Sequence, residues 1–148
     1  MTRWFLLNKA SLRDNIISHW ETLIADSSTG ERKCQAFIQE HPAFFFPHNS
    51  FEEQVVISKL KFGADYESDF INCCNNRSMG FGYQLIELES PNTPPFTKEG
   101  KPSARLTTAV QQILDWQLWI KRNTAEAKRI FPSKEFNVGG HPNFRYLI

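Results

Sequence analysis

The chain has 148 residues and a formal net charge of +1, a length that fits one domain with its own buried core. Thirteen Phe and four Trp residues exclude intrinsic disorder as its main state, because a solvated chain carries far less aromatic surface. No apolar run approaches the roughly 18–20 residues that a membrane span requires, and the short apolar start shows no signal-peptide pattern. We therefore expect a cytoplasmic protein.

The distribution of charge along the chain and the number of cysteines limit the kinds of functional site to be expected. Residues 1–90 hold 8 Lys and Arg against 12 Asp and Glu, whereas residues 91–148 hold 9 against 4. An acidic site beside a basic flank would give this asymmetry, and so would chance segregation of solvated charges. The three cysteines are an odd number without CxxC spacing, so neither a disulfide framework nor a structural zinc site is expected.

The first part of the chain is predicted to be helical. Residues 11–25 place their apolar side chains on one helical face, and Ser11 with Asp14 offers a cap at its start. A second helix is predicted from Glu31 to Glu40. It must stop at the following His41-Pro42 pair, because proline disfavours helix in the residue before it.

The rest of the chain is predicted to form a sheet and a long helix. Three strand-like segments follow one another closely, at residues 55–60, 68–74 and 83–89, and indicate an antiparallel meander. The Pro-rich segment 90–102 must be a loop, and residues 103–123 form the longest helix. A short helical piece and a final strand at 144–148 complete the chain. This order predicts one sheet flanked by helices in an α+β or α/β domain.

Three carboxylates are predicted to meet at one end of this sheet. Asp69 lies early in the second strand, and Glu87 and Glu89 share one face near the end of the third. A hairpin would bring the three together, and hard divalent cations such as Mg²⁺ bind clusters of carboxylate oxygens. The alternative is that Glu87 and Glu89 form the wetted face of an edge strand. Their largely apolar neighbours and the stop at Ser90-Pro91 favour the site.

The long helix adds a polar side chain at the margin of its apolar stripe. The stripe contains Leu106, Ala109, Val110, Ile113, Trp116 and Ile120. Gln112 lies on its shoulder, where a buried amide needs a hydrogen-bond partner. This amide either satisfies a helix-packing contact or points at the sheet-end site, where it would orient a water or a phosphate.

Taken together, these residues resemble a known nuclease core. Asp69-Phe70, then Glu87-Leu88-Glu89-Ser90-Pro91, then Ala109-x-x-Gln112-Ile113 look like the PD-(D/E)XK nucleases, and more narrowly like the Shedu-type anti-phage nuclease domain. The helix end Phe37-Ile38-Gln39-Glu40-His41-Pro42 is similar to the opening of that domain. The resemblance covers residues 31–148 and implies a restriction-endonuclease-like α/β fold. Its mixed sheet would be flanked by helices, with an N-terminal helical extension at residues 1–30.

The resemblance also implies a function. The protein would be a metal-dependent endodeoxyribonuclease that hydrolyses DNA phosphodiester bonds in bacterial anti-phage defence, and it would act as a homo-oligomer away from membranes. Asp69 and Glu87 would hold Mg²⁺ or Mn²⁺, and Glu89 would position or deprotonate the attacking water. Gln112 would orient that water or a phosphate oxygen. Phosphate contacts would come from three residues around the Pro-rich loop, Lys98, Lys101 and Arg105. Plain solvated loop charges are the alternative for these three.

Two positions depart from the family pattern. Ser68 replaces the usual Pro before Asp69, and Glu89 replaces the usual motif Lys. A lysine there would offset negative charge in the transition state, whereas a glutamate can act as a base or as the ligand of a second metal. The rival hypothesis is therefore a catalytically inactive module of the same fold that binds nucleic acid or a partner protein. A third is hydrolysis of another substrate through the same acids.

Overall fold

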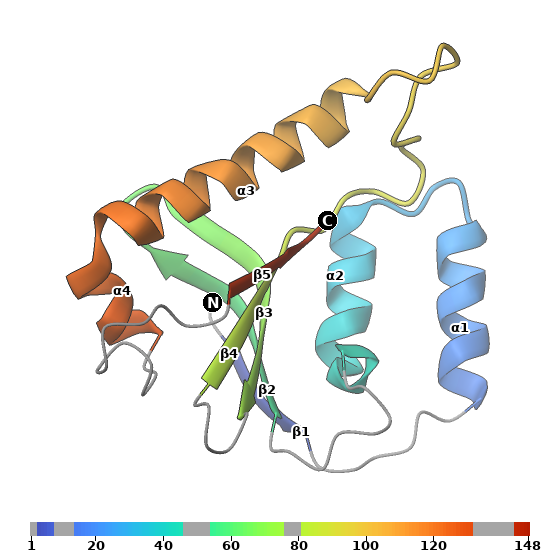
Figure 1. The fold of residues 1–148 in the computed structure, drawn as a ribbon. Coiled ribbons are helices and arrows are strands. Elements are labelled where there is room, and N and C mark those ends of the chain that lie inside the picture. Colours follow the sequence, from blue (N-terminus) through green and yellow to red (C-terminus); the bar gives the residue numbers. More distant parts are fainter. Residues whose placement is uncertain (1–2, 8–13, 46–53, 76–80, 132–143) are drawn as a thin grey trace.

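A five-stranded sheet lies between two layers of helices in the computed structural model, which describes residues 3–7, 14–45, 54–75, 81–131 and 144–148 (Figure 1). The strands are β1 (Arg3–Leu7), β2 (Gln54–Phe62), β3 (Tyr66–Asn75), β4 (Phe81–Ile86) and β5 (Phe144–Leu147). The helices are α1 (Asp14–Ala25), α2 (Glu31–Glu40), α3 (Ala104–Arg122) and α4 (Thr124–Ile130), with the 3₁₀ helix η1 (Pro42–Phe45) after α2.

The sheet is mixed, and its strands lie in chain order from β1 to β5. The first four strands are antiparallel neighbours, which confirms the predicted meander of β2, β3 and β4. Strand β5 returns after the helices and pairs parallel to β4. The expected mixed sheet flanked by helices is thus present. Strand β1 was not predicted, because five residues without polar alternation give no strand pattern of their own.

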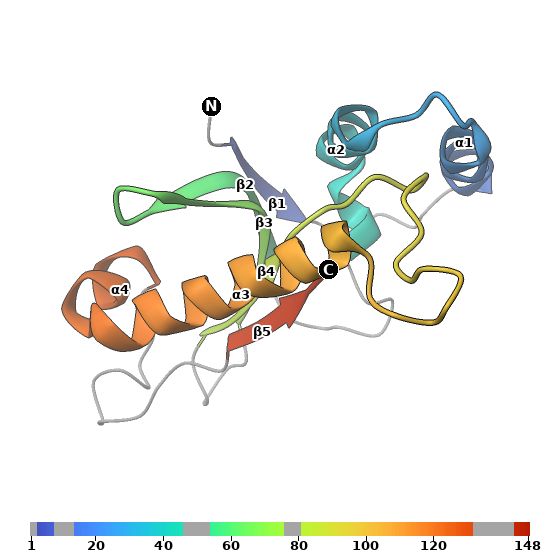
Figure 2. The same ribbon diagram turned by 90° about the horizontal axis from the view of Figure 1, so that it is seen from above.

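Helices cover the two faces of the sheet unequally. Helices α3 and α4 lie across one face, and α2 lies on the other with α1 outside it (Figures 1 and 2). The larger core cluster, under α3 and α4, includes Ile57, Phe62, Ile71, Leu85, Trp116 and Phe131. The smaller cluster, under α2, consists of Ile38, Val56, Phe70 and Ile86. Helix α1 buries no residue, so most of the burial energy lies on the α3 side.

Most predicted helices and strands are confirmed to within two or three residues. Helix α2 has the predicted bounds, and the predicted long helix begins where the Ser103 hydroxyl accepts a hydrogen bond from the Leu106 amide at 3.2 Å. The predicted apolar stripe of this helix is too wide, because Val110 is 42% exposed. The buried residues of α3 form a narrower row within that stripe, namely Ala109, Ile113, Trp116 and Ile120. The proposed cap at Ser11 lies outside the described residues.

The third predicted strand is wrong at its end. It was expected to run to Glu89, but β4 ends at Ile86, before both glutamates. The Glu87 amide donates instead to the Leu147 carbonyl of β5 at 3.0 Å. The next amide, of Leu88, donates to the Asp69 carboxylate at 2.9 Å. Beyond Ile86, the chain is therefore held by the backbone of β5 and by the Asp69 side chain.

Two further points concern the whole chain. Within the described ranges, no helix is both long and apolar enough to cross a membrane. The domain boundary proposed between residues 30 and 31 stays a prediction.

Gly63→Ala should destabilise the domain more than Gly100→Ala. Both glycines have positive φ, 66° and 76°, so an alanine at either position should cost about 1–2 kcal/mol in backbone strain. A Cβ on Gly63 would also lie 2.6 Å from Trp119 Nε1, whereas a Cβ on Gly100 meets nothing within 4 Å. Urea unfolding of both variants measures the difference. Equal losses would show that the indole moves aside without cost.

Candidate active site

Asp69 is a buried carboxylate surrounded by donors from three parts of the fold. Its side chain is 5% exposed. Gln35 Nε2, from α2, donates to Oδ1 at 3.1 Å, and the Lys59 ammonium, from β2, contacts the same oxygen. The Leu88 amide, just after β4, donates to Oδ2 at 2.9 Å. Burying a carboxylate is costly unless it is paired and hydrogen-bonded, and these contacts meet that requirement.

The backbone of β2 is distorted where it meets Asp69. Val55 and Ile57 face the larger core cluster, and so do Leu60 and Phe62, so the alternation of the strand shifts by one residue between the two pairs. Lys59 lies at the shift with φ of 53°, a left-handed conformation that is uncommon outside glycine. This shift lets the Lys59 side chain reach Asp69 while the apolar residues on both sides keep their place in the core.

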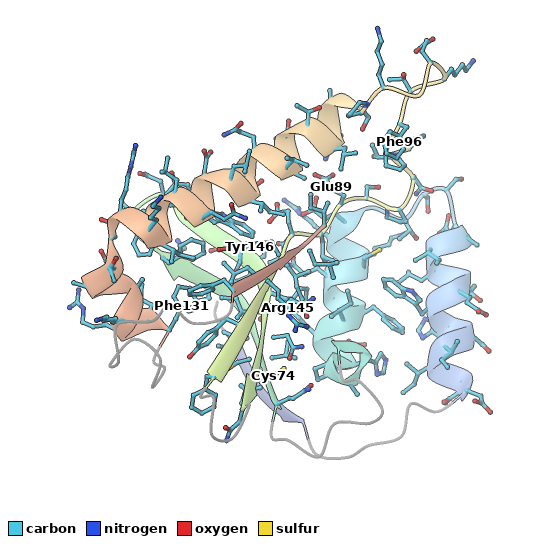
Figure 3. The ribbon with its side chains drawn as sticks, in the orientation of Figure 1. Cys74, Glu89, Phe96, Phe131, Arg145 and Tyr146 are labelled. Carbon is cyan, nitrogen blue, oxygen red and sulfur yellow. The ribbon has the colours of Figure 1, made fainter. Side chains whose placement is uncertain are left out.

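Glutamates add further negative charge around Asp69. Figure 3 shows Glu89 at the end of the sheet, where it lies near Glu31 in the first turn of α2 and Arg105 in the first turn of α3. Burial, followed by the charges of Asp69 and Glu31, raises the pKa of Glu87 to about 8, and Lys59 opposes this shift. The pKa of Glu31, in the first turn of α2, is also raised, by burial and by the charges of Asp69 and Glu89. The site therefore concentrates carboxylates where they are partly buried from solvent.

Arg105, in the first turn of α3, faces this acidic cluster. Its Nη1 lies 3.6 Å from Glu89 Oε2, too far for a hydrogen bond. That oxygen is buried and has no hydrogen-bond partner among the described residues. Arg105, Glu87 and Glu89 line an open hollow of about 320 Å³, together with Leu106 and Ile148. Because the Arg105 side chain is 61% exposed, its charge remains available to an anion from solution.

The loop after the acids is tied to the start of α2. The side-chain amide of Asn92 donates through Nδ2 to the carbonyls of Asp26, Ser27 and Thr29 at 3.3, 3.0 and 2.6 Å. These contacts hold the turn before α2 against the segment that follows β4. They therefore help to place Glu31 beside the other carboxylates.

Four of the residues predicted for the site come together at this end of the sheet: Asp69, Glu87, Glu89 and Arg105. Gln112 is half-buried and lines a separate shallow groove on α3 with Thr108 and Asp115. Lys98 and Lys101 are exposed in the loop between β4 and α3. In the described part of the chain, no hydrogen bond or ion pair joins these last two lysines or Gln112 to the carboxylates. Their proposed roles stay predictions.

Three contributors to the site were missed from the sequence: Glu31, Gln35 and Lys59. A signal for Lys59 existed, because the apolar pattern of β2 changes phase between Ile57 and Leu60. Glu31 and Gln35 are four residues apart and so share one face of α2. Nothing in the sequence distinguishes that face from an ordinary solvated first turn.

The residue types of the site suit a hard divalent cation. Carboxylate oxygens are the preferred ligands of Mg²⁺, and the four interacting carboxylates outnumber the two nearby cationic side chains by two charges when all are ionised. Across the described ranges, however, no group of three or more His, Cys, Asp or Glu residues is placed to hold a metal ion. Donor chemistry and charge therefore fit, while the Asp69 oxygens are engaged by protein donors.

Comparison with known proteins gives one match. The family model described as "Shedu protein SduA, C-terminal" matches residues 28–146. This span runs from the turn before α2 to β5 and contains the carboxylates Glu31, Asp69, Glu87 and Glu89 together with Gln35, Lys59 and Arg105. No curated protein and no solved structure matches the chain.

Without divalent cations, the free energy of unfolding should fall as the pH rises from about 4.5 to about 8, through the shifted pKa of Glu87. In this window the folded state keeps a proton on Glu87 that the unfolded state has lost, so rising pH favours unfolding. Glu87→Gln should remove this part of the pH dependence. Urea titrations in EDTA at several pH values measure it, with the exposed Glu99→Gln as the control. Identical slopes for wild type and Glu87→Gln would contradict the prediction.

Proposed function

Because its residues 28–146 match that model, the chain belongs to the Shedu protein SduA C-terminal family, and we propose that it is a metal-dependent nuclease of PD-(D/E)XK type. The family indicates a part in anti-phage defence. The proposed reaction is hydrolysis of DNA phosphodiester bonds. One observation carries this proposal: the Leu88 amide donates to the buried Asp69 carboxylate, which brings the flanking Glu87 and Glu89 to it at the end of β4.

Each side chain has a proposed part in hydrolysis. Asp69 and Glu87 would hold Mg²⁺ or Mn²⁺, which would supply Lewis-acid activation of the scissile phosphate when bound. Glu89 has a buried oxygen without a hydrogen-bond partner, which suits it to accept a proton from the attacking water. Arg105 would hold a DNA phosphate beside Glu89. Gln112, Lys98 and Lys101 keep their proposed parts as a water- or phosphate-orienting amide and as phosphate contacts.

Lys59 brings a positive charge to a site whose motif position lacks one. The motif lysine is replaced by Glu89, so the position two residues after Glu87, where the motif has a positive charge, carries a negative one. Lys59 reaches the same carboxylates from the neighbouring strand, with its ammonium against Asp69. We therefore assign the positive charge beside Asp69 in the cation-free site to β2 instead of the segment after β4.

A second candidate function is a catalytically inactive module of the same fold that binds nucleic acid or a partner protein. One observation favours it: both Asp69 oxygens already have protein donors. In such a module, the Lys59 ion pair with Asp69 would be a permanent part of the fold. Metal dependence separates the two candidates.

The nuclease proposal predicts cleavage of plasmid and linear DNA in Mg²⁺ or Mn²⁺ but not in EDTA. Glu87→Ala should lower the rate by about 10²-fold or more. It should leave the melting temperature unchanged or slightly raised, because it relieves crowding of like charges. Glu99→Ala, in the exposed loop, is the matched control. A stability loss of several kcal/mol, roughly the scale of a buried charge that loses its partner, would make Glu87 structural and exclude the proposed role.

Substitutions of Glu89 should show whether this glutamate works in the reaction. We expect Glu89→Gln to lose cleavage, because the amide cannot accept a proton, and Glu89→Lys to change the dependence on Mg²⁺ and Mn²⁺. Cleavage rates of the three proteins across metal concentrations measure this. An inactive wild type beside an active Glu89→Lys variant would identify Glu89 as a vestige and support the inactive module.

A further inference from the structure

We propose that Lys59 is an exchangeable counter-ion of Asp69. Its ammonium group takes the cation position beside Asp69 while no divalent cation is bound, and it moves to Glu67 when one binds. This inference rests on the proposed function, because it takes Asp69 as a ligand of the cation. It gives Lys59 a positioning role that the motif does not contain.

The donors of Asp69 differ in how readily they can leave. The Leu88 donor is a backbone amide, and the Gln35 donor is an uncharged amide on α2. Lys59 is the cation among the three, and it shares Oδ1 with Gln35. A divalent cation that approaches this oxygen repels the full charge of the ammonium group more strongly than the dipoles of the two neutral donors. Lys59 is therefore the donor that a metal ion displaces.

A second carboxylate is already within reach of Lys59. Its Nζ lies 3.7 Å from Glu67 Oε1, and the two side chains are 28% and 37% exposed. Glu67 and Asp69 lie two residues apart on β3, about 6–7 Å along one strand. The flexible four-carbon stem of lysine can cover such a step without a change in the backbone. The ammonium group therefore keeps a carboxylate partner in both positions.

The backbone of Lys59 supports a functional reason for this arrangement. A non-glycine residue with φ of 53° inside a strand is strained, and such residues concentrate at functional sites. This backbone conformation directs the Lys59 side chain to the carboxylates of Glu67 and Asp69, which would otherwise repel each other. With Lys59 in place, the crowded acids are neutralised in part before any metal arrives, so the cation-free protein remains folded.

Mn²⁺ binding without DNA tests the exchange directly, by the electron paramagnetic resonance signal of the free ion and by calorimetry. Lys59→Met should bind Mn²⁺ about tenfold more tightly than wild type, because its competitor is gone. Glu67→Gln should bind several-fold more weakly, because the displaced ammonium group loses its second partner. Lys61→Met removes the same charge from the same strand and should stay within about twofold of wild type.

Thermal unfolding in EDTA gives a readout that does not depend on metal. Lys59→Met should melt below wild type, because it leaves the buried Asp69 carboxylate without its cation, and saturating Mn²⁺ should raise its melting temperature more than that of wild type. If Lys59→Met does not fold, Lys59→Gln keeps a hydrogen-bond donor without the charge and carries the same expectations.

The outcomes separate this inference from the proposed function. Weaker Mn²⁺ binding by Lys59→Met, with Glu67→Gln equal to wild type, would overturn the exchange alone and make the ion pair structural. An equal gain in affinity in Lys59→Met and Lys61→Met would overturn it as well, because the effect would then be general charge repulsion. A wild type that binds no Mn²⁺ and cleaves no DNA would overturn both the exchange and the nuclease proposal.

Discussion

The burial of Asp69 is the constraint on which the rest of this structure depends. A carboxylate that is 5% exposed needs donors, because an unpaired buried charge is costly. Helix α2, strand β2 and the segment after β4 each supply one. These contacts tie α2, β2 and the segment after β4 to one carboxylate of β3, so the site also joins three elements of the fold.

The charge balance at this end of the sheet links stability to chemistry. Burial and neighbouring carboxylates raise the pKa of Glu87 to about 8, so the acids resist being ionised together. Lys59, beside Asp69, and Arg105, beside Glu89, compensate only part of the charge. A divalent cation would complete the compensation. The nuclease and the inactive module differ in one physical respect, namely whether the Asp69 pair opens to admit that cation.

The molecule separates the part that holds it together from the part that carries the site. The larger cluster, with Trp116 and Phe62 fully buried between the sheet and α3, provides a rigid base. The carboxylates lie outside this cluster, within β3, just after β4 and in the first turn of α2. The side-chain hydrogen bonds of Asn92 then hold the turn before α2 against the segment after β4.

Local patterns in the sequence were enough for most of the helices and strands, the bounds of α2, the meander and the proximity of Asp69, Glu87 and Glu89. Periodicity, caps and proline stops act within a few residues, so they can be interpreted without a structure. The phase change of β2 at Lys59 is visible in the sequence, but the pairing of Lys59 with Asp69 and the end of β4 became visible only in three dimensions. A carboxylate on β3 contacts a lysine on the neighbouring strand and accepts an amide hydrogen bond from 19 residues further along the chain. Neither contact has a local pattern, because each depends on where β2, β3 and the segment after β4 come to lie against one another.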